Sequence, residues 1–262
     1  MKIDDFKTNI TKVIDEYVLA QRKAQPLAQS RFRASGITDC PRAILFSMMN
    51  LPHDKHPRAT NDTAKGYKLM RKGTALHEVV QEYLQGIGIL KVENTEKVIK
   101  DDEYLFSGHC DGVLTFDEKE VLLEIKTINP DGFKSITQPK EAHFYQGQAY
   151  TYFLNRQFGH KIDDILFLYV DRGSDNLDMK PFWVHKDQAV VDMILNKLKV
   201  MKQYYDKQEL YPVPEGFNPN DSKFTPCRWC PFNTPELCRS GKLKMSDFPS
   251  ANIIKAKPII NE

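Results

Sequence analysis

The sequence contains no apolar run that approaches the length of a membrane-spanning helix. Such a helix needs about 20 consecutive apolar residues, so we expect no membrane-embedded segment. The first residues, Met1 to Asp5, also lack the apolar core of a secretory signal peptide. Together these absences predict a cytoplasmic protein without a membrane partner.

A surplus of charge of either sign is also missing. The formal net charge is +2 over 262 residues, so a surface for nucleic acid must be sought in local patches. The five cysteines are odd in number and are not spaced like a secreted disulfide framework. We therefore expect them to bind a metal or a cluster.

The remaining composition is that of a soluble globular protein, with 41% hydrophobic and 27% charged residues. Apolar periodicity predicts helices at residues 3–24, 63–85, 140–158 and 187–208. Strands are expected at residues 95–100, 106–116, 121–126, 164–171 and 181–185, with a turn at 129–132. This mixture predicts an α/β fold, in which helices flank a mixed central sheet.

Residues 106–127 carry the most informative pattern. Two β-rich runs flank the polar residues 117–120, which predict a hairpin loop of two to four residues. Side chains alternate between the faces of a strand, so Glu124 and Lys126 share one face. With a two-residue loop, Asp111 lies opposite Glu124, at about 5 Å between Cβ atoms. With a four-residue loop, Asp111 faces Lys126 and still lies near Glu124.

Two carboxylates this close repel each other, so one takes up a proton unless a cation lies between them. A hard divalent metal bound by oxygen ligands removes the conflict, and Lys126 adds positive charge beside it. This combination suits hydrolysis of a phosphodiester bond. Taken alone, the same Glu-x-Lys pattern is also typical of a surface hairpin with a solvated ion pair. Cys110 precedes Asp111 and is expected to face away from it, into the core.

The predicted helix at 63–85 combines a histidine with a basic segment. His77 is either a metal ligand or, as is commoner for a lone helical histidine, a residue at the edge of the core. Just upstream lie four basic residues: Lys65, Lys68, Arg71 and Lys72. Together with Arg42 in the N-terminal arm, they contact phosphates or form a solvated basic face.

The predicted helix at 140–158 presents His143, Gln146 and Tyr150 on one face. This face fits either packing at the edge of the core or the lining of a site. Gly147 in the same helix costs about 1 kcal/mol relative to alanine. Its presence indicates a close approach by another backbone or by a ligand.

The cysteines outside the hairpin form an uneven array. Three follow the pattern C-x2-C-x7-C beyond a proline-rich linker, and one lies far upstream: Cys227, Cys230, Cys238 and Cys40. A zinc ribbon usually pairs two local C-x2-C knuckles, and this chain has one.

In their order and contexts, these motifs resemble the RecB-type branch of the PD-(D/E)XK nucleases. The matching residues are His77, Gly108 to Asp111, Glu124 to Lys126, Gln146 and Tyr150. The cysteine array is similar to that of the iron-sulfur subgroup, which includes the CRISPR-associated RecB-like exonucleases and the nuclease domain of AddB. The resemblance implies a restriction-endonuclease-like core at residues 60–210, with an N-terminal arm (1–59) and a C-terminal arm and tail (211–262) joined by a cysteine-bound cluster.

The resemblance also implies a role for each residue. Mg²⁺ or Mn²⁺ would be held by four residues: Asp111, Glu124, His77 and, through its carbonyl, Ile125. Lys126 would orient or deprotonate the attacking water and offset charge at the scissile phosphate. Gln146 and Tyr150 would position the DNA strand or the water at the metal.

The four cysteines Cys40, Cys227, Cys230 and Cys238 would carry a [4Fe-4S] cluster. Zinc is the alternative, because the x7 gap departs from the shorter gap that is common in the subgroup.

The implied function is a metal-dependent exonuclease that hydrolyses single-stranded or end-containing DNA in recombination, repair or end processing. Its partners would be DNA and a recombination or repair protein. Two alternatives stay open: a structure-specific or nicking endonuclease on the same scaffold, and a non-catalytic, zinc-containing DNA-binding module.

Overall fold

The computed structural model describes residues 3–23, 31–49, 63–215, 217–220, 227–234 and 237–239. The expected C-terminal tail beyond residue 250 lies outside these residues. Among the helices of the described part, none has the length and apolar character needed to cross a bilayer.

The described helices are α1 (Ile3–Lys23), α2 (Pro41–Met48), α3 (Ala64–Gly86), α4 (Pro130–Ser135), α5 (Glu141–Phe158) and α6 (Gln188–Lys207). The strands are β1 (Phe32–Arg33), β2 (Leu90–Asp101), β3 (Phe106–Phe116), β4 (Lys119–Ile128), β5 (Ile162–Asp171) and β6 (Met179–His185). Each of the four helices expected from periodicity is confirmed, with both ends within one residue of the prediction.

Local capping explains where several helices begin. The Thr63 side chain accepts a hydrogen bond from the Gly66 N–H at 3.0 Å and starts α3. The predicted turn at 129–132 is wrong, because Pro130 begins α4 and the Asn129 side chain caps it through the Gly132 N–H at 2.8 Å. Asparagine followed by proline favours a helix start as well as a turn, so the local pattern did not separate the two.

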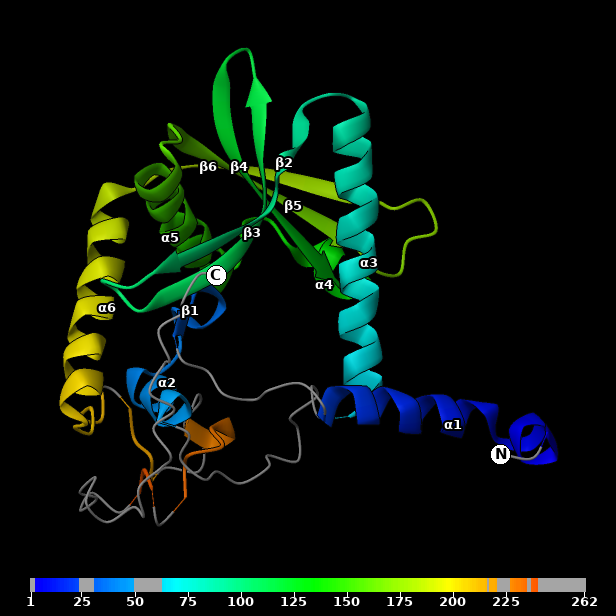
Figure 1. Ribbon diagram of the computed structural model, residues 1–262, viewed down its shortest axis with the longest axis horizontal. Helices are drawn as coiled ribbons and strands as arrows, with labels where there is room; N and C mark the ends of the chain where they lie inside the picture. Colours follow the sequence, from blue (N-terminus) through cyan, green and yellow to red (C-terminus); the bar gives the residue numbers. More distant parts are fainter. Residues whose placement is uncertain are drawn as a thin grey trace, which may run out of the picture.

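The strands form one six-stranded sheet in the order β1-β3-β4-β5-β6, with β2 also paired to β3 (Figure 1). The β3–β4 and β5–β6 pairs are antiparallel, and the β4–β5 and β1–β3 pairs are parallel. The helix α5 lies between β4 and β5 in the chain, as a connection between parallel strands requires. The expected mixed sheet flanked by helices is confirmed.

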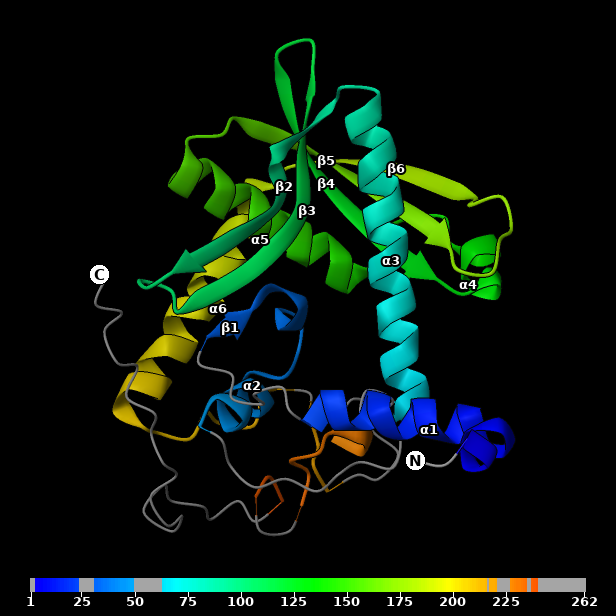
Figure 2. The ribbon, with the colours of Figure 1, turned by 45° about the vertical axis from the view of Figure 1, so that its right-hand side comes forward.

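Two apolar layers cover the two faces of the sheet. On one face, Val80 of α3 packs with Leu123 and Ile125 of β4. On the other, Phe153 of α5 and Leu198 of α6 belong to the larger core. Figure 2 shows α1 lying across the first turns of α3.

The β3–β4 hairpin has the shorter of the two expected loops. Its loop residues Asp117 and Glu118 both have left-handed backbone angles, with φ of 45° and 68°, as a tight two-residue turn requires. Facing pairs run from Phe116–Lys119 to Gly112–Leu123. This register is the one that points Asp111 toward Glu124.

Candidate active site

Asp111 lies where β3 parts from β4. The last facing pair is Gly112–Leu123, and beyond it the Ile125 N–H donates to Asp111 Oδ2 at 2.6 Å. The other oxygen, Oδ1, lies 3.0 Å from Nδ1 of His77 on α3. Asp111 is only 9% exposed, so a strand and a helix fix both oxygens of a nearly buried carboxylate.

Glu96 of β2 supplies a third candidate ligand that the sequence did not reveal. One ligand atom from each of His77, Glu96 and Asp111 lies within 4.8 Å of the others. Gln81, one turn after His77 on α3, donates to Glu96 Oε1 at 2.9 Å and to the Asp111 carbonyl at 2.8 Å. Glu96 has a left-handed φ of 51° and lies just beyond an irregularity in the β2–β3 pairing. The sequence pattern does not predict such an irregularity.

Glu124 and Lys126 form a buried ion pair on β4. Lys126 Nζ donates to Glu124 Oε2 at 2.6 Å, and Glu124 is 1% exposed. Burial raises the pKa of Glu124 to about 7, the positive charge of Lys126 opposes that rise, and the charge of Asp111 adds to it. Burial alone would lower the pKa of Lys126, but Glu124 and Asp111 outweigh it and leave that pKa above its usual range.

Only one of the two carboxylate oxygens of Glu124 is paired with Lys126. Glu124 Oε1 is buried and has no hydrogen-bond partner among the described residues. An unsatisfied buried carboxylate oxygen is costly, and a cation would satisfy it. The site therefore fits a divalent metal. Glu124 lies outside the three-residue group around Asp111, but it lies close enough for the charge of Asp111 to raise the pKa of Glu124.

A pocket of about 810 Å³ opens beside α3. Its polar wall includes His77, Glu96, His109, Asp111, Thr127 and Arg172. Arg172 directly follows β5, at the same edge as the end of β4. Like Glu96, it is a residue that sequence analysis missed, because its distance to Asp111 in the chain gives no local signal.

Tyr150 is buried behind β3. It is 2% exposed, and its hydroxyl accepts a hydrogen bond from Gln146 Nε2 at 3.2 Å. A Cβ atom at Gly108 would collide with the ring, so the glycine allows the ring to pack against β3. Burial, then the charge of Glu124, raises the pKa of Tyr150 above its usual range. The structure thus places Gln146 and Tyr150 together, close to Glu124.

The other two residues noted on α5 have packing partners. A Cβ atom at Gly147 would meet the ring of Phe167 at 2.7 Å, so the close approach comes from a side chain rather than a backbone or a ligand. His143 Nδ1 lies 2.6 Å from the Tyr169 hydroxyl. Burial, then the charge of Lys126, lowers the pKa of His143 to about 4.

The basic residues separate into two groups. Lys65, Lys68, Arg71 and Lys72 are exposed on α3, and Lys68 pairs with Asp15 of α1 at 2.5 Å. Arg42 is only 7% exposed, and its Nη1 donates to the Tyr211 carbonyl at 2.8 Å. This burial contradicts the prediction that Arg42 contacts DNA phosphates, because a guanidinium enclosed by the protein cannot reach them.

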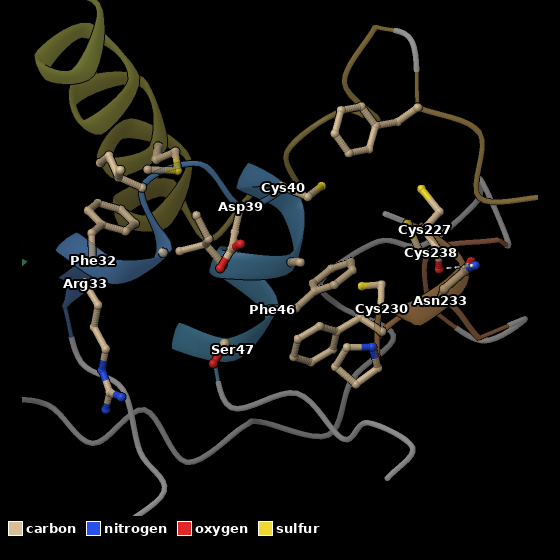
Figure 3. A pocket seen from close by; sticks show the side chains of 18 of the residues that line it. Phe32, Arg33, Asp39, Cys40, Phe46, Ser47, Cys227, Cys230, Asn233 and Cys238 are labelled. Atoms are coloured by element: carbon tan, nitrogen blue, oxygen red, sulfur yellow. Dashed lines mark hydrogen bonds between the residues drawn. The ribbon is translucent and has the colours of Figure 1, made fainter. Parts of the chain in front are cut away.

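The cysteines expected to act together line one pocket of about 560 Å³. Cys40, at the start of α2, and the C-terminal cysteines Cys227, Cys230 and Cys238 surround a common space (Figure 3). Burial raises the pKa of Cys230 to about 11, and the other three cysteines each add to it. Cys110 is fully buried in the core, as predicted. All five cysteines are free.

No protein-family model matches the sequence, and no curated protein matches it. Solved structures with a similar fold include a protein designated SSO0001, with 16% identity, a TM-score of 0.49, and coverage of 89% of this chain and 98% of that chain. An alkaline exonuclease (LHK-Exo) from Laribacter hongkongensis has 18% identity, a TM-score of 0.48, and coverage of 74% and 93%. A phage related exonuclease from Haemophilus somnus 129PT has 13% identity, a TM-score of 0.40, and coverage of 68% and 94%. At such values, function has to be argued from the site itself.

Proposed function

We propose that the protein is a divalent-metal-dependent deoxyribonuclease that hydrolyses DNA from a free end. The observation that carries this proposal is the pairing of two carboxylates across the β3–β4 hairpin. Asp111 is held by His77 and by the Ile125 N–H, and Glu124 is buried against Lys126 with one oxygen unsatisfied. Neither group is arranged as a solvated surface pair.

The donor set suits Mg²⁺ or Mn²⁺. Carboxylate oxygens from Asp111, Glu124 and Glu96 are hard ligands, and His77 adds an imidazole nitrogen. The resemblance to RecB-type nucleases adds the carbonyl of Ile125. A bound ion of this kind stabilises charge on phosphate oxygens and increases the acidity of water.

Side chains around the proposed metal site orient the water, bind the phosphate and hold the ligands in place. Lys126, fixed by Glu124, directs its ammonium group toward the attacking water and offsets charge at the phosphate. The water oxygen bonds to phosphorus while the bond from phosphorus to the leaving sugar oxygen breaks, and that oxygen is released with a proton. Arg172 on the pocket wall pairs with a non-bridging phosphate oxygen. Gln146 and Tyr150 position the protein strand β3, which carries Gly108 and Asp111.

The cysteine pocket holds a structural cofactor in this proposal. Cys40, Cys227, Cys230 and Cys238 bind a [4Fe-4S] cluster, or zinc in its place, and fasten the arm at residues 1–59 to the arm at 211–262. The four thiols line one pocket although they come from segments far apart in the chain. Thiolates are the ligands that both metals prefer.

The function is tested with end-labelled linear DNA and covalently closed circular DNA, each with Mg²⁺ or Mn²⁺. We expect shortening of linear DNA that stops when the metal is chelated, and no attack on the circle. Cleavage of the closed circle would favour the endonuclease alternative, because an exonuclease needs an end. Intact linear DNA under all metal conditions would contradict the nuclease proposal and favour a binding module.

The exposed basic residues of α3 are expected to contact the DNA backbone. Replacing Lys68, Arg71 and Lys72 by alanine should weaken binding of every DNA sequence alike. The plot of log affinity against log salt concentration has a negative slope, and the magnitude of this slope should decrease by about 0.9 for each lost contact. A matched triple variant on α6, across the sheet, is Lys199, Lys202 and Lys207 to alanine. An unchanged slope in the α3 variant and a reduced slope in the α6 variant would place the DNA on the other face.

A further inference from the structure

Arg42 is an unusual residue for its position. An arginine is rarely buried unless its charge is paired, yet Arg42 is 7% exposed. It donates to the Tyr211 carbonyl at 2.8 Å and lies over the ring of Phe46, whose centroid is 5.3 Å from the guanidinium carbon. Its Nε is buried and has no hydrogen-bond partner among the described residues. Neither the Tyr211 carbonyl nor the Phe46 ring carries a negative charge.

A thiol that can become a thiolate lies near Arg42. Arg42 lies two residues after Cys40 in the chain, and Phe46 lines the cysteine pocket. Burial raises the pKa of Cys238, while the charge of Arg42 and a hydrogen bond from its side chain lower it. Thus the guanidinium lies close enough to stabilise a thiolate on the C-terminal arm.

Lys197 provides a contrast, because the two residues that it contacts, Ile37 and Asp39, line the same pocket. Its ammonium group donates to the carbonyls of Ile37 and Asp39, at 2.6 and 3.0 Å, immediately before Cys40. These carbonyls take two of the three donors of Lys197, and the charge of Asp39 partly compensates its ammonium group. Arg42 differs because no carboxylate among the described residues pairs with it, and its Nε has no partner there.

We propose that Arg42 is the counter-charge of the cysteine-bound cofactor, and that its guanidinium donates to the sulfur of Cys238. Four thiolates around iron or zinc leave a net negative charge, which is costly to bury without a compensating cation. A guanidinium buried beside the thiolates supplies that cation and a charge-assisted hydrogen bond. The inference depends on the cofactor in the proposed function, but it does not depend on the nuclease activity.

The test compares Arg42→Met and Arg42→Lys with wild type. The control is Arg31→Met, which removes an arginine of the N-terminal arm that pairs with Asp102 instead of a thiol. The measurement is the rate of iron or zinc release into excess chelator, followed by metal analysis and, for iron, by visible absorption. We expect Arg42→Met to release the metal about 10-fold faster, the change expected for one lost charge-assisted hydrogen bond. Arg42→Lys should be intermediate, and Arg31→Met should match wild type.

A second measurement separates this role from simple packing, because Arg42 also contacts Tyr211 and Phe46. Thermal unfolding is followed for metal-loaded and metal-free protein. Arg42→Met should reduce the stabilisation that the metal provides, while a packing defect lowers both melting temperatures equally. In an iron-loaded protein, loss of the positive charge should also shift the cluster potential to a more negative value. An unchanged release rate, or equal loss of stability in both forms, would overturn the proposal. Wild-type protein that binds neither iron nor zinc would overturn it together with the cofactor, while the nuclease test would stand.

Discussion

We expect Asp111→Ala to lower the rate of DNA cleavage by about 1000-fold or more. Asp111 joins three elements, because its oxygens contact His77 of α3 and the Ile125 N–H of β4 and its group includes Glu96 of β2. Its loss removes a hard ligand and also leaves the Ile125 N–H without its acceptor. Glu124→Gln should have a comparable effect, because the neutral amide weakens metal binding and leaves Lys126 without its counter-charge.

The measurement is single-turnover cleavage of end-labelled DNA over a series of Mn²⁺ concentrations. DNA binding should largely persist in both variants, because the proposed phosphate contacts lie on α3. Glu93→Ala is the control, because it removes an exposed carboxylate of β2 that does not line the pocket beside α3. Lys126→Ala should lower turnover far more than metal affinity. Cleavage at the wild-type rate in Asp111→Ala or Glu124→Gln would remove that residue from the catalytic site.

Cys40→Ser and Cys230→Ser are expected to cause the largest loss of stability. Each removes a ligand from a cofactor that ties the start of α2 to the C-terminal arm. A cross-link that closes a loop of such length contributes on the order of 4 to 5 kcal/mol in the entropy model for disulfides, used here as a guide to scale. This value is comparable to the total stability of a domain, so we expect poorly soluble, colourless protein.

The measurements are the iron and zinc content per chain, visible absorption and thermal unfolding. Cys110→Ala is the control, because Cys110 is fully buried in the apolar core and outside the cysteine pocket, so this variant should keep the cofactor. Anaerobically purified wild type should be brown, with about four irons per chain for a [4Fe-4S] cluster. One zinc per chain and no iron would contradict the iron-sulfur cluster, but a metal would still join the two arms of the chain. Cys40→Ser protein with wild-type metal content and melting temperature would contradict the proposal that a cysteine-bound metal joins the two arms.

The short-range features of the fold were predictable because they depend on neighbours in the chain. Apolar periodicity located the ends of α3, α5 and α6 within one residue. The alternation of side chains along β4 placed Glu124 and Lys126 on one face, and a two-residue loop set the pairing register from Phe116–Lys119 onward. The same alternation predicted that Cys110 is a core residue.

Only the tertiary structure decided which distant residues join these local patterns. Glu96 comes close to Asp111 because the β2–β3 pairing is irregular and because Gln81 of α3 holds both residues. Arg42 is buried because α2 packs against the C-terminal part of the chain, where the carbonyl of Tyr211 accepts its hydrogen bond. A sequence reports the charge of such residues but not the dielectric surroundings that packing gives them. Burial decided that Arg42 faces the protein interior while Lys68 faces solvent.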